Sequence, residues 1–304
     1  MAEACIPVDI FNPGQVFACL GFIEAADILL GDAEGGFDWR DEGNVRFRMH
    51  AAGTESPVAV VLKFLVGATV KSIAPAGSSN TTEAWQVPTT ALDRDEGFPF
   101  PDPRSPATLP AVLEGRSPDA QASVALSIDH WGDETRRDPV KFWGGGAGYP
   151  GAALARDAVA LLRHALASGA AVDAWDAAVA DPFNLSAQQS SSFRFDWRRD
   201  YVPIDIGFSI NTQKGKIATA GFPIVELLAA IGLGHARPAR LRILEYRYGT
   251  LGAGDDLLDP VLLRAALGGA GLPLPRRSFR MKLAWPGKEG QARVITTVTE
   301  EAIP

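Results

Sequence analysis

Hydrophobic and polar positions along the first 74 residues predict six elements of secondary structure. Residues 6–11 favour a short strand. Asn12 and Pro13 then favour the start of a helix over 14–30, because Asn caps helices and Pro suits their first turn. The pattern goes on to predict strands over 36–40 and 45–49, a helix over 58–66 and a strand over 69–73. This order is that of the split βαβ, or ferredoxin-like, unit on which RNA-recognition domains are built, so we expect an α+β fold.

The predicted helix over residues 14–30 is almost entirely apolar. Its polar residues are Gln15, Glu24 and Asp27, and the last two, three residues apart, share one narrow stripe of the helix. We expect this stripe to face solvent and Leu20 to lie in the core.

The Pro- and Ser-rich stretch after residue 74 shows no regular period and is predicted to be a long loop or insertion. Beyond it, the pattern predicts strands over 123–128 and 140–143, a Gly-rich loop, and helices over 152–167 and 173–180. We therefore divide the chain into a ferredoxin-like unit over 1–74, a loop or insertion over 75–120, and a mixed α+β part over 121–304.

Aromatic and basic residues alternate at the start of the most distinctive stretch. In a strand, Phe193, Phe195 and Trp197 would share one face, with Arg194 and Arg198 on the other. The pattern then predicts strands over 205–210 and 215–219, a buried helix over 224–233 that begins at Pro223, a strand over 241–248, a helix over 259–267, and strands over 278–285 and 292–298.

Charge singles out the same region. Residues 194–282 hold 14 Lys and Arg against 8 Asp and Glu, a net of +6, while the rest of the chain holds 15 against 28, a net of −13; the two sum to −7. Guanidinium groups bind phosphates and stack on bases, so a basic third in an acidic protein favours contact with nucleic acid. The candidate contacts are Arg194, Arg198, Arg199, Lys214, Lys216, Arg237 and Arg240. We expect the aromatic residues to lie in the core. The alternative to nucleic-acid contact for the arginines is pairing with Asp196 and Asp200.

Composition narrows the class of protein. At 304 residues with 46% apolar content, the chain is typical of a soluble globular protein. Cys5 and Cys19 show no metal or disulfide spacing, and we see no signal peptide and no run of about 18 apolar residues. We expect a cytoplasmic protein without a membrane span.

No catalytic motif stands out. The pattern G-x-G-x-x-G over 146–151 follows a possible strand, but Asp173, the acidic residue at the required distance, lies in a predicted helix, and Pro150 is unusual inside such a motif, so a dinucleotide site is not favoured. The four histidines have no metal-ligand spacing. His130, with Arg136 and Arg137 nearby, offers the one local combination of a base and a cation suited to RNA cleavage. We expect no cofactor, no metal and no catalytic residue.

Several segments resemble a known family: residues 6–39, 129–151, 190–209 and 223–233, with Phe195-Asp196-Trp197-Arg198-Arg199 and Asp205-Ile206-Gly207-Phe208-Ser209 as the most specific motifs. They are similar to CRISPR-associated accessory or large-subunit-like proteins of the type I-U (I-G) systems, which have about this length. The resemblance implies antiviral defence within a Cascade-like complex that contains crRNA, whose backbone subunits use ferredoxin-like (RAMP) folds, and it implies no small-molecule cofactor.

Together these observations predict a non-catalytic subunit of a type I CRISPR effector. Its partners would be other Cas subunits and crRNA or target DNA, contacted through the basic region. Two alternatives stay open: a crRNA-processing endoribonuclease that uses His130, and a pure protein scaffold without nucleic-acid contact, which the acidic balance of the chain favours.

Overall fold

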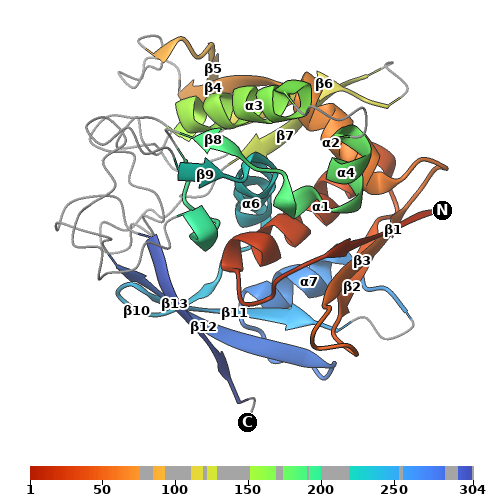
Figure 1. Cartoon of the computed structure of the whole chain (residues 1–304), viewed down its shortest axis with the longest axis vertical. Helices are drawn as coiled ribbons and strands as arrows, with labels where there is room; N and C mark the ends of the chain where they lie inside the picture. Colours follow the sequence, from red (N-terminus) through yellow and green to blue (C-terminus); the bar gives the residue numbers. More distant parts are fainter. Residues whose placement is uncertain are drawn as a thin grey trace.

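The structure of the protein is a computed structural model (Figure 1). It describes residues 1–75, 85–92, 111–118, 122–128, 151–168, 174–189, 192–199, 219–252, 256–284 and 294–302. Over these residues the chain is a mixed α+β protein with six α-helices and four small sheets, which confirms the predicted α+β class. The strands predicted over 140–143, 205–210 and most of 215–219 lie outside the described residues.

The first 75 residues form the six elements in the predicted order. They are β1 (Ala2–Pro7), α1 (Pro13–Leu30), β2 (Glu34–Asp38), β3 (Arg46–Ala51), α2 (Pro57–Gly67) and β4 (Thr69–Pro75). The side chain of Asn12 caps α1 by accepting a hydrogen bond from the amide of Gly14, with Pro13 at the first helical position, as predicted. The first strand begins four residues earlier than expected and ends at Pro7.

The four strands of this unit belong to two sheets. Strands β1, β3 and β2 pair antiparallel in the order β1-β3-β2. Strand β4 instead pairs with β5 (Thr89–Leu92) and β6 (Ala111–Arg116), and β6 pairs with β7 (Ser123–Ile128). Helix α2 is buried on nearly every face, because it lies between α1 and this second sheet. The expectation of no regular element after residue 74 is therefore wrong for β5 and β6.

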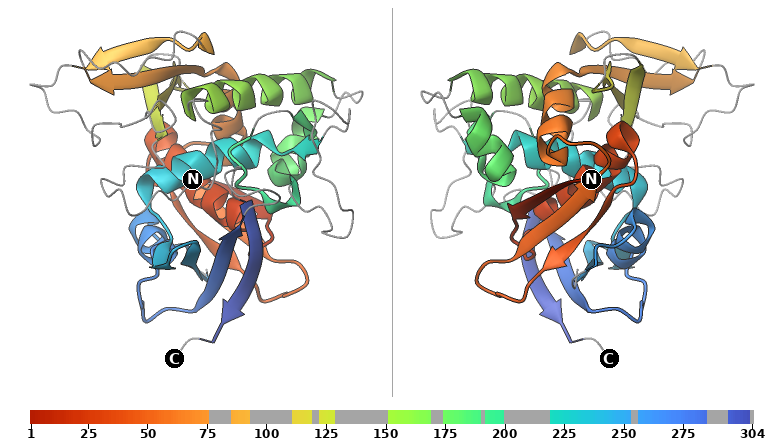
Figure 2. Two further views of the ribbon diagram at one scale, coloured as in Figure 1. Left: turned by 90° about the vertical axis from the view of Figure 1, so that its left-hand side faces the viewer. Right: turned by 90° about the vertical axis from the view of Figure 1, so that its right-hand side faces the viewer.

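Helices α1 and α6 (Pro223–His235) pack against each other at the centre of the molecule (Figure 2). Two glycines allow the close approach of the helices. A Cβ atom on Gly21 would lie 1.9 Å from the carbonyl oxygen of Leu228, and one on Gly232 would lie 2.2 Å from that of Phe17. The predicted buried helix after Pro223 is confirmed, and Leu20 is buried in α1 as expected.

Helix α1 is also the one helix, among the residues described, that is long and apolar enough to cross a membrane. Over this 18-residue window α1 has a mean hydropathy of 1.4, although Gln15, Glu24 and Asp27 interrupt the apolar run. Within the structure, 83% of that window is buried against the rest of the protein. Here α1 is the central core helix.

The remaining helices and strands surround this pair. They are α3 (Gly151–Ser168), α4 (Ala174–Ala180), the short strands β8 (Ala187–Gln189) and β9 (Thr219–Gly221), then β10 (Ala239–Arg242), β11 (Glu245–Leu251), α7 (Pro260–Leu267), β12 (Arg276–Ala284) and β13 (Val294–Glu301). The last four strands form an antiparallel sheet in the order β10-β11-β12-β13, which lies below α1 and α7 in Figure 1.

One predicted strand is a hairpin instead. The strand expected over 241–248 is split into β10 and β11 by a turn in which Leu244 has a φ of 62° and Ile243 is 72% exposed. A leucine in the left-handed region cannot continue a strand, so the chain reverses there.

The polar stripe predicted on α1 is only half exposed. Asp27 faces solvent, but Glu24 is 1% exposed and both of its oxygens accept hydrogen bonds from Arg264 of α7, at 2.5 and 2.6 Å. His235, at the end of α6, places Nδ1 3.0 Å from the same carboxylate. At Glu24 the stripe is covered because α7 packs on α1. The carboxylate of Glu24 therefore connects α1 with α6 and α7.

A single hydrophobic cluster runs from Ile6 to Ile295. It includes Leu113 of β6, so it draws residues from all three parts into which the sequence was divided. The division itself stays a prediction.

Candidate nucleic-acid interface

The aromatic and basic segment over 193–199 is not the predicted strand. Residues 193–196 have no regular secondary structure, and a short 3-10 helix, η4 (Trp197–Arg199), follows. Arg194 has a φ of 65°, which interrupts any strand. Phe193 and Phe195 are fully buried and stacked, with ring centroids 5.5 Å apart, so the expectation that they belong to the core is confirmed.

Asp196 is the buried centre of this segment. Its Oδ1 accepts hydrogen bonds from Asn12 Nδ2 at 2.9 Å and from the amide and Nε of Arg198, each at 3.0 Å. Its own amide donates to Glu226 Oε1 at 3.3 Å. Asp196 thereby joins the start of α1, which Asn12 caps, to the first turn of α6, which holds Glu226.

Arg198 is a structural residue in this arrangement. Its guanidinium group also donates to Asn184 Oδ1 at 2.8 Å and to the carbonyl oxygen of Phe183 at 2.6 Å, and it stacks over the ring of Phe222 at 3.6 Å. Little of its hydrogen-bonding capacity is left for a phosphate. The prediction that Arg198 contacts nucleic acid is therefore not supported by its position, and the alternative pairing with Asp196 is confirmed.

The structure scatters the other predicted contacts. Arg194 is half-buried beside Phe193, and Arg237 is half-buried after the end of α6. Arg240 is exposed on β10, opposite Tyr246. The side chain of Arg199, and Lys214 and Lys216 entirely, lie outside the described residues. The predicted contacts that the structure describes thus come from two stretches of the chain, the segment over 193–199 and the residues from the end of α6 into β10.

Other basic residues of the same third of the chain come together on the C-terminal sheet. One face of β11 and β12 is buried through Tyr246, Tyr248, Phe279 and Met281, and the ring of Tyr248 lies 5.8 Å from that of Phe17 in α1. Residues alternate between faces along a strand, so the other face carries the remaining positions. We define the basic strip as the cations there and on the adjacent β10, namely Arg242, Arg247, Arg276, Arg280 and Lys282. Two acids share this face, Glu245 and Glu301, which leaves a net charge of +3.

Glu245 organises one end of the basic strip. Its carboxylate lies 2.5 Å from Arg242 Nε and 3.4 Å from Lys282 Nζ, and it also pairs with Arg280. Glu245 is 3% exposed although it is on the outer face, because these three cations cover it. Hydrogen bonds from Arg242, Arg280 and Lys282 lower the pKa of Glu245 to about 2. Glu245 thus holds Arg242, Arg280 and Lys282, whose side chains are 68%, 35% and 52% exposed, respectively.

A cavity of about 330 Å³ lies at the other end of the basic strip. Its lining includes Arg247, Arg276, Ser278 and the chain over 269–271. Arg276 donates to the carbonyl oxygen of Ala270 at 3.1 Å, which holds its guanidinium group beside the cavity. Arginines and backbone next to an open cavity are typical of sites for anionic ligands.

The sequence contains a signal for the basic strip. In the strand predicted over 278–285, Arg280 and Lys282 alternate with Phe279 and Met281, a pattern typical of a half-buried strand with a basic outer face.

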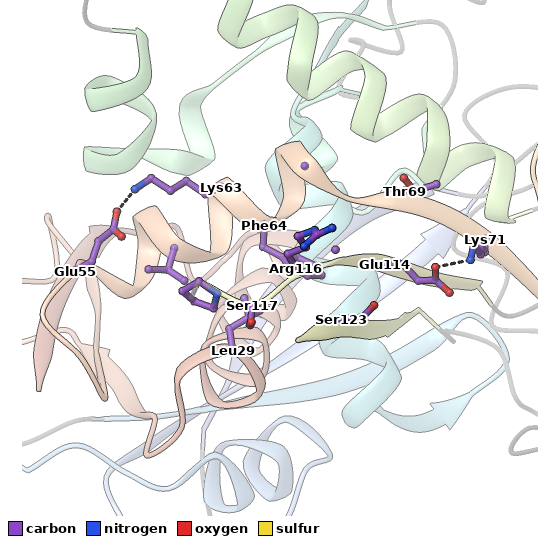
Figure 3. Close-up of a pocket in the computed structure, with 14 residues that line it drawn as sticks. Leu29, Glu55, Lys63, Phe64, Thr69, Lys71, Glu114, Arg116, Ser117 and Ser123 are labelled. Atoms are coloured by element: carbon purple, nitrogen blue, oxygen red, sulfur yellow. Dashed lines mark hydrogen bonds and ion pairs between the residues drawn. The ribbon is translucent and has the colours of Figure 1, made fainter. Parts of the chain in front are cut away.

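A larger cavity, of about 750 Å³, lies between α2 and the hairpin of β6 and β7 (Figure 3). Its rim carries two ion pairs, Lys63 with Glu55 and Lys71 with Glu114, and Phe64 lines it. With Arg116, the lining holds three cations and two acids, a net charge of +1, which is smaller than the +3 of the basic strip.

The structure does not test the nuclease alternative, because His130, Arg136 and Arg137 lie outside the described residues. Within the described ranges, no group of three or more His, Cys, Asp or Glu residues is placed to hold a metal ion.

Comparisons of the chain with protein-family models, with curated proteins and with solved structures found no match.

Proposed function

We propose that the protein is a non-catalytic subunit of a nucleic-acid-containing complex and that the basic strip contacts the phosphate backbone. The resemblance in sequence specifies the complex as a type I-G CRISPR effector. The observation that carries the proposal is the excess of cations over acids on one exposed face of the C-terminal sheet.

The basic strip has the chemistry that backbone contacts require. Arg and Lys bind phosphates regardless of base sequence, and this electrostatic contribution dominates non-specific affinity. Glu245 holds Arg242 and Arg280 in fixed positions, so less side-chain freedom is lost on binding. The rest of the chain is strongly acidic, which favours a subunit that reaches nucleic acid through one face and meets partner proteins elsewhere.

We also propose that the N-terminal unit is a ferredoxin-like unit that has lost its fourth strand to a neighbouring sheet. The order β1-β3-β2 and the intervening helices are those of such a unit, and β4 follows α2 as it should. The unit differs from a complete ferredoxin-like unit because β4 pairs with β6 of the neighbouring sheet.

A scaffold without nucleic-acid contact is the second candidate function. One observation favours it: Arg198, from the most specific motif of the resemblance, is engaged inside the protein rather than at its surface. The first proposal and the scaffold make opposite predictions about co-purified nucleic acid.

Co-purification tests the proposed function. The tagged chain would be expressed with the products of the genes beside its own, and any nucleic acid in the purified complex would be extracted and sequenced. We expect crRNA in the complex, in smaller amount when Arg242 and Lys282 are both replaced by Gln. A complex that assembles fully and retains crRNA equally well with this double variant would favour the scaffold.

A further inference from the structure

We infer that the basic strip binds single-stranded rather than double-stranded nucleic acid, with the strand running along β12. This inference rests on the proposed function and specifies the form of its ligand. It comes from the geometry of the outer face of the C-terminal sheet.

Strand β12 presents one straight row of polar groups on that face: Lys282, Arg280, Ser278 and Arg276. Neighbours in this row are two residues apart, a spacing of about 6.8 Å along a strand. Successive phosphates of one strand are separated by one nucleotide of backbone, a length similar to this spacing. The row can therefore contact successive phosphates of one strand.

The flanks of the row are unequal. On the β11 side, Arg247 lies directly opposite Arg280 and adds a cation. On the β13 side, Thr297 and Thr299 lie opposite Lys282 and Arg280, and the acid Glu301 lies opposite Ser278. A duplex presents two phosphate rows separated by a groove about 6 or 12 Å wide. The cations lie on β12 and on the β10 and β11 side of it, whereas β13 carries no cation and its Glu301 is already paired with Arg247 at 2.5 Å. A second row of phosphates would therefore find no cation on the β13 side.

The cavity beside Arg276 adds to this preference. It opens where the row ends, and Gly249 of β11 forms part of its lining. Its volume of about 330 Å³ is at the small end of ligand sites, which range from roughly 300 to 1,000 Å³. A single strand can turn one base out of the row into such a cavity, whereas the bases of a duplex are stacked and paired.

Fluorescence anisotropy with the full chain tests the inference. The probes are an oligothymidylate, an oligouridylate of the same length and a duplex of matched length, each at about 50 and about 200 mM salt. We expect at least one single strand to bind about tenfold more tightly than the duplex. The oligothymidylate and oligouridylate arms show whether DNA or RNA is preferred.

The variant Lys282→Gln locates the binding on the row, with Lys63→Gln as the matched control. Both lysines are about half exposed and each pairs with a glutamate, but Lys63 lies on α2, outside the basic strip. We expect Lys282→Gln to lower the salt slope for the single strand by about 0.7 and Lys63→Gln to leave it unchanged.

The outcomes separate the inference from the proposed function. Duplex binding as tight as single-strand binding, with a salt slope that still depends on Lys282, would overturn the inference and leave the proposed function standing. Equal effects of the two lysine variants would also overturn it. Absence of binding to any probe at low salt would overturn both.

Discussion

Asp196 binds Arg198 through the same three hydrogen bonds by which Asp38 binds Arg40. In both pairs the carboxylate accepts from the backbone amide, Nε and one terminal nitrogen of the arginine, at 3.0, 3.0 and 2.6 Å in the first pair and at 3.2, 2.9 and 2.5 Å in the second. The sequence Phe-Asp-Trp-Arg is identical at the two places. The surroundings differ, because Asp196 is fully buried while Arg40 is 65% exposed.

This repeat provides a matched pair of variants. Breaking a buried ion pair by removing one partner costs about 3–5 kcal/mol, whereas an exposed pair contributes about 0–1 kcal/mol. We expect Asp196→Ala to lower the free energy of unfolding by the larger amount and Asp38→Ala by the smaller. Denaturant melts measure both; losses of equal size would show that Asp196 does not anchor α1 and α6.

The contact between Gly21 and Leu228 predicts a second difference in stability. An added methyl group at Gly21 would meet backbone 1.9 Å away, so α1 and α6 would have to separate. We expect Gly21→Ala to destabilise the protein by about 1–3 kcal/mol or more. Gly67→Ala is the control, because among the described residues no atom outside its own helix and chain neighbours lies within 4 Å of the position of its Cβ. A neutral Gly21→Ala would contradict the close helix packing.

His235 makes stability depend on pH. Burial lowers the pKa of His235 below its ordinary value of 6.5; Glu24 opposes this and Arg264 adds to it. Below about pH 6.5 the unfolded chain therefore binds a proton that the folded protein does not, and the free energy of unfolding falls with falling pH. We expect a shallower fall between about pH 7 and pH 5 for His235→Gln in denaturant melts. An identical pH profile for the variant would contradict this assignment.

Local signals in the sequence predicted most helices correctly. Asn12 marks a helix start by capping and Pro223 by proline, and these signals depend only on neighbouring residues. The apolar runs after them predicted burial of α1 and α6, because a helix without a broad polar face has to be covered on all sides.

The failures involve contacts between distant parts of the chain. Glu24 looked exposed because its partner Arg264 is 240 residues away. Arg198 looked available because the burial of Asp196 depends on Asn12, 184 residues earlier. The alternating aromatic residues over 193–199 do not form the expected strand. The contacts of Asp196 and Arg198 with distant residues stabilise an irregular segment and override the local preference for a strand. The basic strip could have been predicted from the alternation around Arg280.

The role of Glu245 predicts a gain in binding. Its pKa of about 2 keeps it ionised at neutral pH, where it neutralises part of the charge of Arg242, Arg280 and Lys282. We expect Glu245→Gln to bind oligothymidylate several-fold more tightly than the wild type at low salt, because the net charge of the basic strip rises by one. Circular dichroism checks that the sheet is retained. Unchanged affinity in a folded variant would place the ligand elsewhere.

The salt dependence of nucleic-acid binding tests the central claim most directly. The measurement compares the slope of log K against log salt for the wild type with that of Arg242→Gln/Lys282→Gln. Arg40→Gln/Lys63→Gln is the control, since these two cations lie outside the basic strip and are similarly exposed and paired with acids. Two lost phosphate contacts should lower the slope by about 1.4–1.8, with no change in the control. Equal slopes for the wild type and the basic-strip variant would contradict the claim that this face binds nucleic acid.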